Sequence, residues 1–327
     1  MFYSDVIIVG GGPAGSSCAW KLKQAGIDCI ILDKETFPRS KVCAGWITPK
    51  IIKDLGFKPN DYPHSLLAFN KIHFNIYGKM LPIKTFQYSI RRYEFDKWLL
   101  DRSGVPVYKH RVRKIKQSSE GYLVDDEYFC KHLVGAGGTD CPVYRTFFQF
   151  TIPRKETLLI IALADEFKYD HKDENCYLWF FKNKLPGYSW YVPKGNGYIN
   201  IGIGGIYHKL LKRNITIRDQ WNYFIHELSD LSLVKQYNHT PRGYYYYLRQ
   251  SIWIGHINNV YIIGDSAGLA TKDLGEGIGP AVKSGILAAN SIINTTGYYL
   301  HTITRYSIPN LVINGLVNYE DQVQKVL

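Results

Sequence analysis

The sequence contains no apolar run long enough to cross a lipid bilayer. Its longest, residues 158–164, has the length of a β-strand, whereas a membrane-spanning helix needs roughly 18 apolar residues or more. A secretory signal peptide is not expected, because Asp5 interrupts the first apolar stretch and no basic residues precede it. We therefore do not interpret residues 158–164 as a membrane-spanning segment or the first apolar stretch as a signal peptide.

Cysteine spacings typical of metal or redox sites are also lacking. The six cysteines include no C-x-x-C pair, and the ten histidines form no cluster. We therefore expect no metal site, and reduced thiols in the cytoplasm are the simplest interpretation. A serine–histidine–acid signature is absent too, which argues against hydrolase chemistry.

Acidic residues are few relative to basic ones. The 327 residues include 40 Lys and Arg against 28 Asp and Glu, which gives a net charge of +12. If focused on one face, this excess would favour an anionic partner such as a phosphate group or a membrane surface. The densest basic run, residues 109–116, is either a solvated strand face or a contact with an anionic membrane or partner. No nucleic-acid-binding module accompanies it, so nucleic acid is not an expected partner.

Glycines are concentrated in a turn near the N-terminus. A predicted buried strand, residues 5–10, leads into G-x-G-x-x-G, a helix follows over residues 14–23, and a second strand ends at Asp33. The three glycines are Gly10, Gly12 and Gly15. This arrangement places a pyrophosphate at a helix N-terminus and the acid on an adenosine ribose, and it disfavours a 2′-phosphate.

A second glycine-rich segment decides between two dinucleotides. A predicted strand ends in Gly264 and Asp265, followed by Gly275, Gly277 and a small-residue helix. The carboxylate can accept hydrogen bonds from a ribityl hydroxyl, and the glycines allow backbone to approach a flat flavin ring. The positive end of the helix would face the pyrimidine side of that ring. An NAD dehydrogenase needs no such element, so the sequence predicts FAD.

These segments, taken together, resemble a known superfamily. The turn at residues 10–15, the stretch 133–140 and Gly264-Asp265 are similar to the three FAD motifs of the para-hydroxybenzoate hydroxylase superfamily. Residues 37–45 resemble the P-x-x-x-x-C-G-G loop of geranylgeranyl reductases, and residues 187–193 resemble their G-Y-x-W-x-F-P motif. The chain departs from the family pattern where Ala44 replaces a glycine and Thr271-Lys272 replaces Asn-Pro.

The resemblance implies an α/β fold, with a Rossmann-like FAD-binding domain of the para-hydroxybenzoate hydroxylase type and an antiparallel β-sheet substrate lobe. We expect the FAD-binding domain to comprise residues 1–66, 91–150 and 251–299. Residues 67–90 and 151–250 would form the substrate lobe, and residues 300–327 a C-terminal helical tail. Within the FAD domain, residues 107–128 have the pattern of a hairpin excursion.

The resemblance also implies cofactor contacts along most of the chain, including an arginine, Arg92, that approaches the flavin. The predicted cofactor-binding residues are Gly10, Gly12, Pro13, Ala14, Gly15, Asp33, Lys34, Arg39, Cys43, Ala44, Gly45, Arg92, Val112, Gly137, Gly264, Asp265, Gly275, Gly277 and Ile278.

For catalysis, Cys43 is a candidate proton donor, and Tyr188 and Trp190 are candidates to line the substrate tunnel. The alternative for all three is packing in the protein interior. Trp46 and Lys272 are weaker candidates.

The predicted function is reduction of a double bond in an apolar, isoprenoid-like substrate by hydride transfer from reduced FAD. An external electron donor, with NAD(P)H as a transient one, would supply the reducing equivalents. The alternatives are a flavin-dependent monooxygenase or halogenase, and a non-catalytic FAD-binding protein. The expected location is the cytoplasm, with peripheral contact with an anionic membrane as an alternative.

Overall fold

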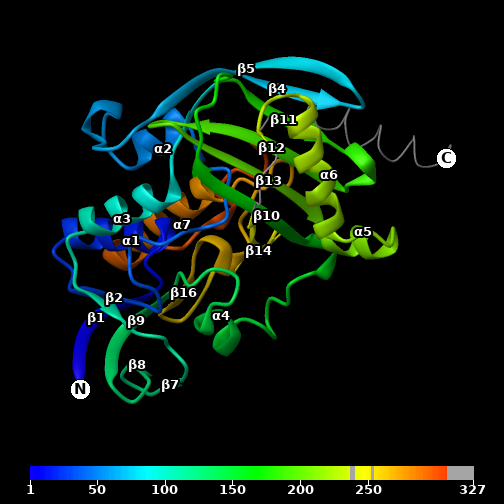
Figure 1. Ribbon diagram of the computed structural model, residues 1–327. Helices are drawn as coiled ribbons and strands as arrows, with labels where there is room; N and C mark the ends of the chain where they lie inside the picture. The colour runs from blue at the N-terminus through cyan, green and yellow to red at the C-terminus, as the bar shows by residue number, and fades with distance from the viewer. Residues whose placement is uncertain (236–239, 252–253, 308–327) are drawn as a thin grey trace.

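The computed structural model describes residues 1–235, 240–251 and 254–307. Their strands form two eight-stranded sheets, one mainly parallel and one mainly antiparallel. The chain passes from the first sheet to the second and back twice, so each sheet is assembled from segments far apart in the sequence (Figure 1).

The first sheet has the strand order β15-β16-β9-β1-β2-β6, with β7 and β8 attached beyond β9. Residues 6–9 of β1 are at most 5% exposed, because β1 pairs in parallel with β2 on one side and β9 on the other. The strands are β1 (Phe2–Val9), β2 (Cys29–Asp33), β6 (Val107–Lys109), β7 (Ile115–Gln117), β8 (Tyr122–Val124), β9 (Tyr128–Gly135), β15 (His256–Ile257) and β16 (Val260–Ile262).

Helices α1 (Pro13–Gln24), α3 (Arg92–Arg102) and α7 (Ile278–Asn294) lie together between the two sheets, as Figure 1 shows. Helices α1 and α7 cross closely at Gly285, where a Cβ atom would lie 2.3 Å from the carbonyl oxygen of Ala14. The short α4 (Pro142–Phe147) follows β9. This crossing fixes the N-terminal end of α7 relative to the glycine-rich turn that precedes α1.

The second sheet has the order β14-β10-β13-β12-β11-β4-β5-β3. Its strands are β3 (Trp46–Ile47), β4 (Leu67–Ile76), β5 (Lys79–Ser89), β10 (Leu159–Lys168), β11 (Cys176–Phe180), β12 (Gly187–Lys194), β13 (Tyr198–Ile206) and β14 (Arg242–Tyr247). The predicted strands between residues 158 and 203 are thus confirmed, and all their pairings with one another are antiparallel. The pairing of β11 with β4 is parallel.

Side chains of β11 alternate between the two faces of this sheet. Trp179 packs on Phe224 of α6 (Ile217–Asp230), with ring centroids 5.6 Å apart. Leu178 and Phe180 point to the opposite face, into a core shared with Trp190. The helices α5 (Tyr207–Lys212) and α6 therefore cover one face, and the other face looks toward the first sheet. The remaining helix, α2 (Pro49–Asp54), begins at Thr48, whose side chain caps it.

Two predicted segments differ from the structure. Residues 107–128 do not form a single hairpin excursion: β6 adds to the first sheet in parallel with β2, while β8 pairs antiparallel with both β7 and β9. The strand β3 joins the second sheet through the pairs Trp46↔Ser89 and Ile47↔Tyr88. The strands β6 and β3 pair with strands distant in the sequence, β2 and β5. The local sequence pattern of such short strands does not reveal these partners.

The predicted helical tail begins with a short 3-10 turn at Leu300–Thr302, and residues 308–327 lie outside the described part of the chain. Within the described residues, we find no helix that combines the length and apolarity needed to span a membrane.

Candidate active site

A cleft of about 920 Å³ lies between the two sheets. All the predicted cofactor-binding and catalytic residues line it except Gly15 and Gly264. Those two shape its walls. A Cβ at Gly15 would lie 1.9 Å from the carbonyl oxygen of Gly10, and a Cβ at Gly264 would lie 3.0 Å from the Cβ of Ala14. Both positions therefore need glycine for close packing under the cleft.

One end of the cleft is built by the turn between β1 and α1. Gly10 has a φ of +113° and leaves no room for a Cβ beside the carbonyl of Ala136. Gly12 is the N-cap of α1, so no side chain occupies the first N–H groups of this helix. Asp33 lies at the end of β2 and accepts hydrogen bonds from the backbone N–H of Gly11 at 2.6 Å and of Glu35 at 2.8 Å. These bonds fix the carboxylate at the edge of the cleft.

The other end is built by the N-terminus of α7. Its N-cap is also a glycine, Gly277, and Gly275 has a φ of +62°. A Cβ at Gly275 would lie 2.3 Å from the hydroxyl of Tyr246, so backbone and ring meet without space for a side chain. Tyr244 donates a hydrogen bond to Asp265 at 3.0 Å. The cleft thus has a helix N-terminus at each end, both capped by glycine.

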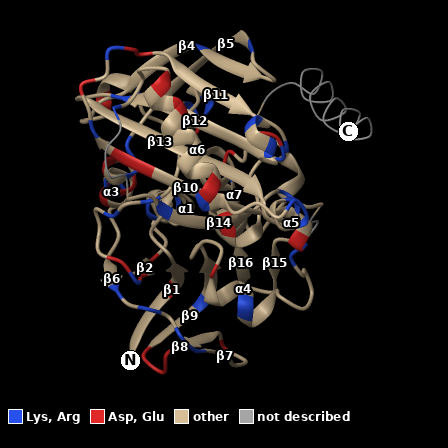
Figure 2. Ribbon diagram, turned by 45° about the vertical axis from the view of Figure 1, so that its right-hand side comes forward, with Lys and Arg blue, Asp and Glu red and all other residues tan. Residues whose placement is uncertain are grey.

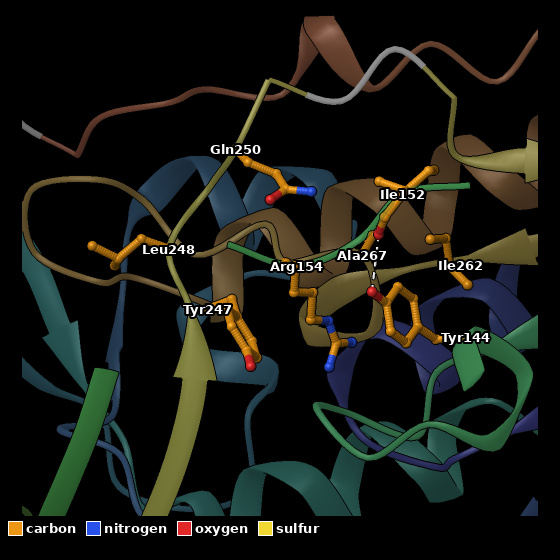
Figure 3. Close-up of a pocket in the computed structure, with 9 residues that line it drawn as sticks. Tyr144, Ile152, Arg154, Tyr247, Leu248, Gln250, Ile262 and Ala267 are labelled. Carbon is orange, nitrogen blue, oxygen red and sulfur yellow. Dashed lines mark hydrogen bonds between the residues drawn. The ribbon is translucent and has the colours of Figure 1, made fainter. Parts of the chain in front are cut away.

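Arg154 connects two of the loops that form the cleft. Its guanidinium donates hydrogen bonds to the carbonyls of Thr139 and Ser266, the latter at 2.9 Å. Figure 3 shows this side chain beside the rings of Tyr144 and Tyr247, whose centroids lie 3.8 and 5.1 Å from its central carbon. The arginine therefore holds the loop after β9 against the loop after β16.

Cys43 lies in a loop that two distant groups fix in place. Its sulfur accepts a hydrogen bond from the N–H of Gly45 at 3.3 Å. The ammonium group of Lys194, at the end of β12, donates to the carbonyls of Ala44 and Gly45. Burial lowers the pKa of Lys194 to about 8, although the nearby Glu166 and Cys43 act in the opposite direction.

An ion pair supports the same loop from α3. Arg92 donates two hydrogen bonds to the fully buried Asp96, at 2.6 and 2.7 Å, and Arg39 contacts that carboxylate at 3.3 Å. Burial opposes the charge of Arg92, but Asp96 and the Cys43 thiol raise the pKa of the guanidinium above its ordinary value. Arg92 thus presents a permanent positive charge to Cys43.

The two aromatic candidates stand on β12 and face the cleft. Tyr188 donates a hydrogen bond to the carbonyl of Leu274, and the indole N–H of Trp190 donates to Asn200 at 2.8 Å. The Trp190 ring lies over Gly202, where a Cβ would come within 2.1 Å of it. Each ring therefore has its polar group satisfied and its apolar surface available.

The structure adds residues to the cleft that sequence reasoning missed, and it places one candidate outside the lining. Lys41 lies over the Tyr244 ring, and burial lowers its pKa to about 7. The signal for Lys41 was its place in the Cys43 loop. Tyr244 and Tyr246, from the tyrosine run of β14, also line the cleft. Lys272 is exposed and lies outside the lining of this cleft.

Comparison with known proteins agrees with this geometry. A family model described as FAD dependent oxidoreductase matches residues 5–95. An uncharacterized protein of Methanosarcina barkeri is 30% identical over 315 residues, which cover 88% of this chain and 74% of the relative. Digeranylgeranylglycerophospholipid reductase 1 of Methanopyrus kandleri is 29% identical, over 61% of this chain and 57% of its own. The chain belongs to the FAD-dependent oxidoreductases.

Two solved structures share the fold of this FAD-dependent oxidoreductase. A geranylgeranyl bacteriochlorophyll reductase-like protein of Thermoplasma acidophilum superposes with a TM-score of 0.77 at 19% identity, covering 100% of this chain and 84% of its own. The flavin-dependent halogenase CmlS gives a TM-score of 0.69 at 20% identity, and the match covers 90% of this chain and 59% of CmlS. Menaquinone reductase of Mycobacterium tuberculosis is a further sequence relative, 25% identical over 88% of this chain and 76% of its own.

The cleft of this FAD-dependent oxidoreductase fits its cofactor. The glycine-capped N-terminus of α1 offers free N–H groups and a positive dipole end for a pyrophosphate. The fixed carboxylate of Asp33 would accept hydrogen bonds from a ribose, and the second glycine-capped helix, α7, would stabilise a flavin ring that gains negative charge on reduction. The cleft that joins these two ends has a volume of about 920 Å³.

Replacing Asp33 with alanine should weaken FAD binding by about 1–3 kcal/mol, because ribose hydroxyls and the N–H groups of Gly11 and Glu35 would lose a buried acceptor. The measurement is a titration of apoprotein with FAD, followed by flavin fluorescence. Asp28→Ala, at the exposed start of the same strand, is the matched control and should bind FAD like the parent. An unchanged dissociation constant for Asp33→Ala would remove the ribose assignment.

Proposed function

We propose that this enzyme reduces a carbon–carbon double bond in an apolar, polyprenyl substrate. The observation that carries the proposal is the position of Cys43: its loop borders the cleft beside an apolar core that includes Phe74, Phe180 and Trp190. A thiol at the edge of an apolar wall suits protonation of a hydrocarbon double bond. The names of two relatives, a digeranylgeranylglycerophospholipid reductase and a menaquinone reductase, support the same substrate class.

We assign FAD to the cleft, held by the residues predicted above that line it. Gly12 and Ala14 would receive the pyrophosphate, Asp33 the adenosine ribose, and Asp265 a ribityl hydroxyl. Val112 would contact the adenine side, and Gly275 to Ile278 the flavin ring. Arg154 binds both the loop after β9 and the loop after β16, and would keep the cofactor-binding residues of these two loops at a fixed distance from one another.

Bound FAD, once reduced by an external donor such as NAD(P)H, supplies the hydride for one carbon of the double bond. The chain supplies the proton for the other carbon from the Cys43 thiol. The sulfur keeps the electron pair of its S–H bond, and solvent later returns a proton to it. Arg92 and Lys194 lie beside Cys43, and their positive charges would stabilise the thiolate left after proton transfer. Tyr188 and Trp190 would hold the hydrocarbon by contact with their ring faces.

This function is tested by mixing anaerobically reduced enzyme with geranylgeraniol in detergent micelles. We expect the oxidised flavin spectrum to return, and the product to gain two hydrogens by mass spectrometry. Octaethylene glycol monododecyl ether, an apolar molecule without carbon–carbon double bonds, is the control and should leave the flavin reduced. If geranylgeraniol and menaquinone both leave the flavin reduced, reduction of polyprenyl double bonds is not the activity.

A flavin-dependent oxygenation or halogenation is a second candidate, favoured by the structural likeness to CmlS. Oxygen consumption that rises on addition of substrate, with an oxygen or halogen atom gained by the product, would identify it. A reductase instead consumes no oxygen in proportion to product.

A further inference from the structure

The end of the β4–β5 hairpin exposes large apolar side chains to solvent. We define the hairpin tip as residues 77–86. Tyr77, Met80, Leu81 and Phe86 in this tip are between 43% and 52% exposed. The corresponding part of β5 lies at the edge of the second sheet, since β3 pairs only with Tyr88 and Ser89. Such a concentration of apolar groups on an exposed edge is typical of an interaction surface.

The charged residues of the hairpin itself all have one sign. Residues 67–89, which cover both strands of the hairpin, include three lysines and no Asp or Glu. The lysines are Lys71, Lys79 and Lys84, and all three are exposed. In Figure 2 the strands β4 and β5 carry no red of Asp or Glu, although acidic residues of a neighbouring loop are seen at the same end of the molecule. Exposed apolar side chains flanked by lysines match the surface of an anionic bilayer.

A row of aromatic rings leads from the tip to the cleft. Tyr77 lies 6.0 Å from Phe181 between ring centroids, and Phe181 lies 6.0 Å from Phe180. Phe180 is 5.2 Å from Tyr188, which is 5.9 Å from Trp190. The last two rings line the cleft. An apolar chain leaving a bilayer at the tip would meet ring surfaces all the way to the cleft.

We propose that the hairpin tip docks on an anionic lipid membrane, and that the aromatic row forms a wall along which a polyprenyl chain passes from the bilayer to the cleft. Docking follows from the exposed side chains and charge of the tip alone. The passage of substrate rests on the proposed function.

The basic run at residues 109–116 does not serve this contact. It lies near β7 and β8, at the end of the molecule away from β4 and β5 (Figures 1 and 2). Acidic groups also neutralise part of it: Asp126 pairs with Lys114 and Lys116, and Asp125 contacts His110 at 2.7 Å. The end near β7 and β8 also exposes apolar groups, Met1, Phe2 and Tyr3, but acidic groups pair with its lysines, whereas the hairpin contains no Asp or Glu. One flat membrane cannot contact both ends at once, so the two ends are tested separately below.

Co-sedimentation of the full chain with vesicles tests the docking. We expect binding to vesicles containing phosphatidylglycerol and weak binding to pure phosphatidylcholine. The double variants Met80→Ser/Leu81→Ser and Lys79→Glu/Lys84→Glu should each lose binding by roughly tenfold or more, because apolar insertion and the attraction of lysines both contribute. Phe150→Ser/Leu211→Ser, which changes apolar residues that are 89% and 60% exposed elsewhere, is the matched control and should bind like the parent.

Three results would overturn the docking. These are absence of vesicle binding by the parent, unchanged binding by both tip variants, and loss of binding in Lys114→Glu/Lys116→Glu while the tip variants bind normally. If sedimentation velocity instead shows a parent dimer that the tip variants dissociate, and vesicles do not bind, the tip contacts a second copy and the membrane proposal fails. FAD content and thermal unfolding show whether each variant is folded.

Turnover separates this inference from the proposed function. The tip variants should reduce geranylgeraniol in detergent micelles like the parent, and should lose activity on geranylgeraniol embedded in phosphatidylglycerol vesicles. If the tip variants lose activity equally in micelles and in vesicles, the proposed passage of substrate along the aromatic row is wrong. A parent that binds vesicles but reduces geranylgeraniol in neither medium would contradict the proposed function and leave the docking supported.

Discussion

Replacing Cys43 with alanine should leave FAD bound and slow the reoxidation of reduced enzyme by substrate by about 10²–10⁴-fold, the usual contribution of a positioned general acid. Cys43→Ser should recover little of this rate, because a hydroxyl group is a much weaker acid than a thiol. The loop itself should persist in both variants, because Lys194 and the N–H of Ile90 hold its carbonyls independently of the sulfur. Anaerobic stopped-flow absorbance of the flavin measures the rate directly.

Cys176→Ala is the matched control for this prediction. Cys176 is buried on β11 in the same lobe but does not line the cleft, so its replacement should leave the reoxidation rate unchanged. If Cys43→Ala and Cys43→Ser both reoxidise at the parent rate, Cys43 only packs in the loop. A thiol reagent that fails to label Cys43 in folded, flavin-free protein would lead to the same conclusion.

The second large effect concerns Lys194 and pH. Its pKa falls from the ordinary 10.5 to about 8 in the folded protein, mainly through burial. Between these two values the unfolded chain holds a proton that the folded chain has released, so raising the pH favours folding. The free energy of unfolding should therefore rise from pH 8 to 10.5 by an amount on the order of 3 kcal/mol from this one residue. Below pH 8 the contribution is constant.

Urea unfolding of the parent and of Lys194→Met at pH 8 and pH 10 isolates this effect. Methionine fills similar space without a titrating group, so the increase should be smaller in the variant than in the parent. Lys84→Met, at an exposed position, is the control and should keep the parent's pH dependence. The same pH dependence in Lys194→Met and in the parent would show that Lys194 stays charged when buried.

Local sequence was sufficient where function depends on consecutive residues. The turn from Gly10 to Gly15 and the acid at Asp33 follow one another within one β-α-β unit, so their geometry is set by nearby sequence. The cysteine loop and the aromatic pair on β12 could be found for the same reason, since each carries its own short motif. These segments all contribute residues to the lining of one cleft.

Sequence was insufficient where a side chain acts across the fold. Lys194 reaches the carbonyl of Ala44, 150 residues earlier, and its position in a strand gives no local sign of this contact. Arg154 likewise binds Ser266, 112 residues later. The motif that contains Lys272 likewise does not show that this side chain is exposed and outside the cleft lining. These contacts depend on how the two sheets meet, which no local pattern encodes.

The repeated passage of the chain between the sheets also determines the order in which the protein can fold as it is synthesised. Strand β1 finds one neighbour, β2, within thirty-three residues of the N-terminus, but its other neighbour, β9, is complete only at Gly135. The partner of β9 on its far side, β16, ends at Ile262. At roughly 5–20 residues per second on the ribosome, the N-terminal strand therefore waits several seconds for its second partner. The parallel sheet closes only after the whole antiparallel lobe has emerged, so its early segments need protection from premature pairing during synthesis.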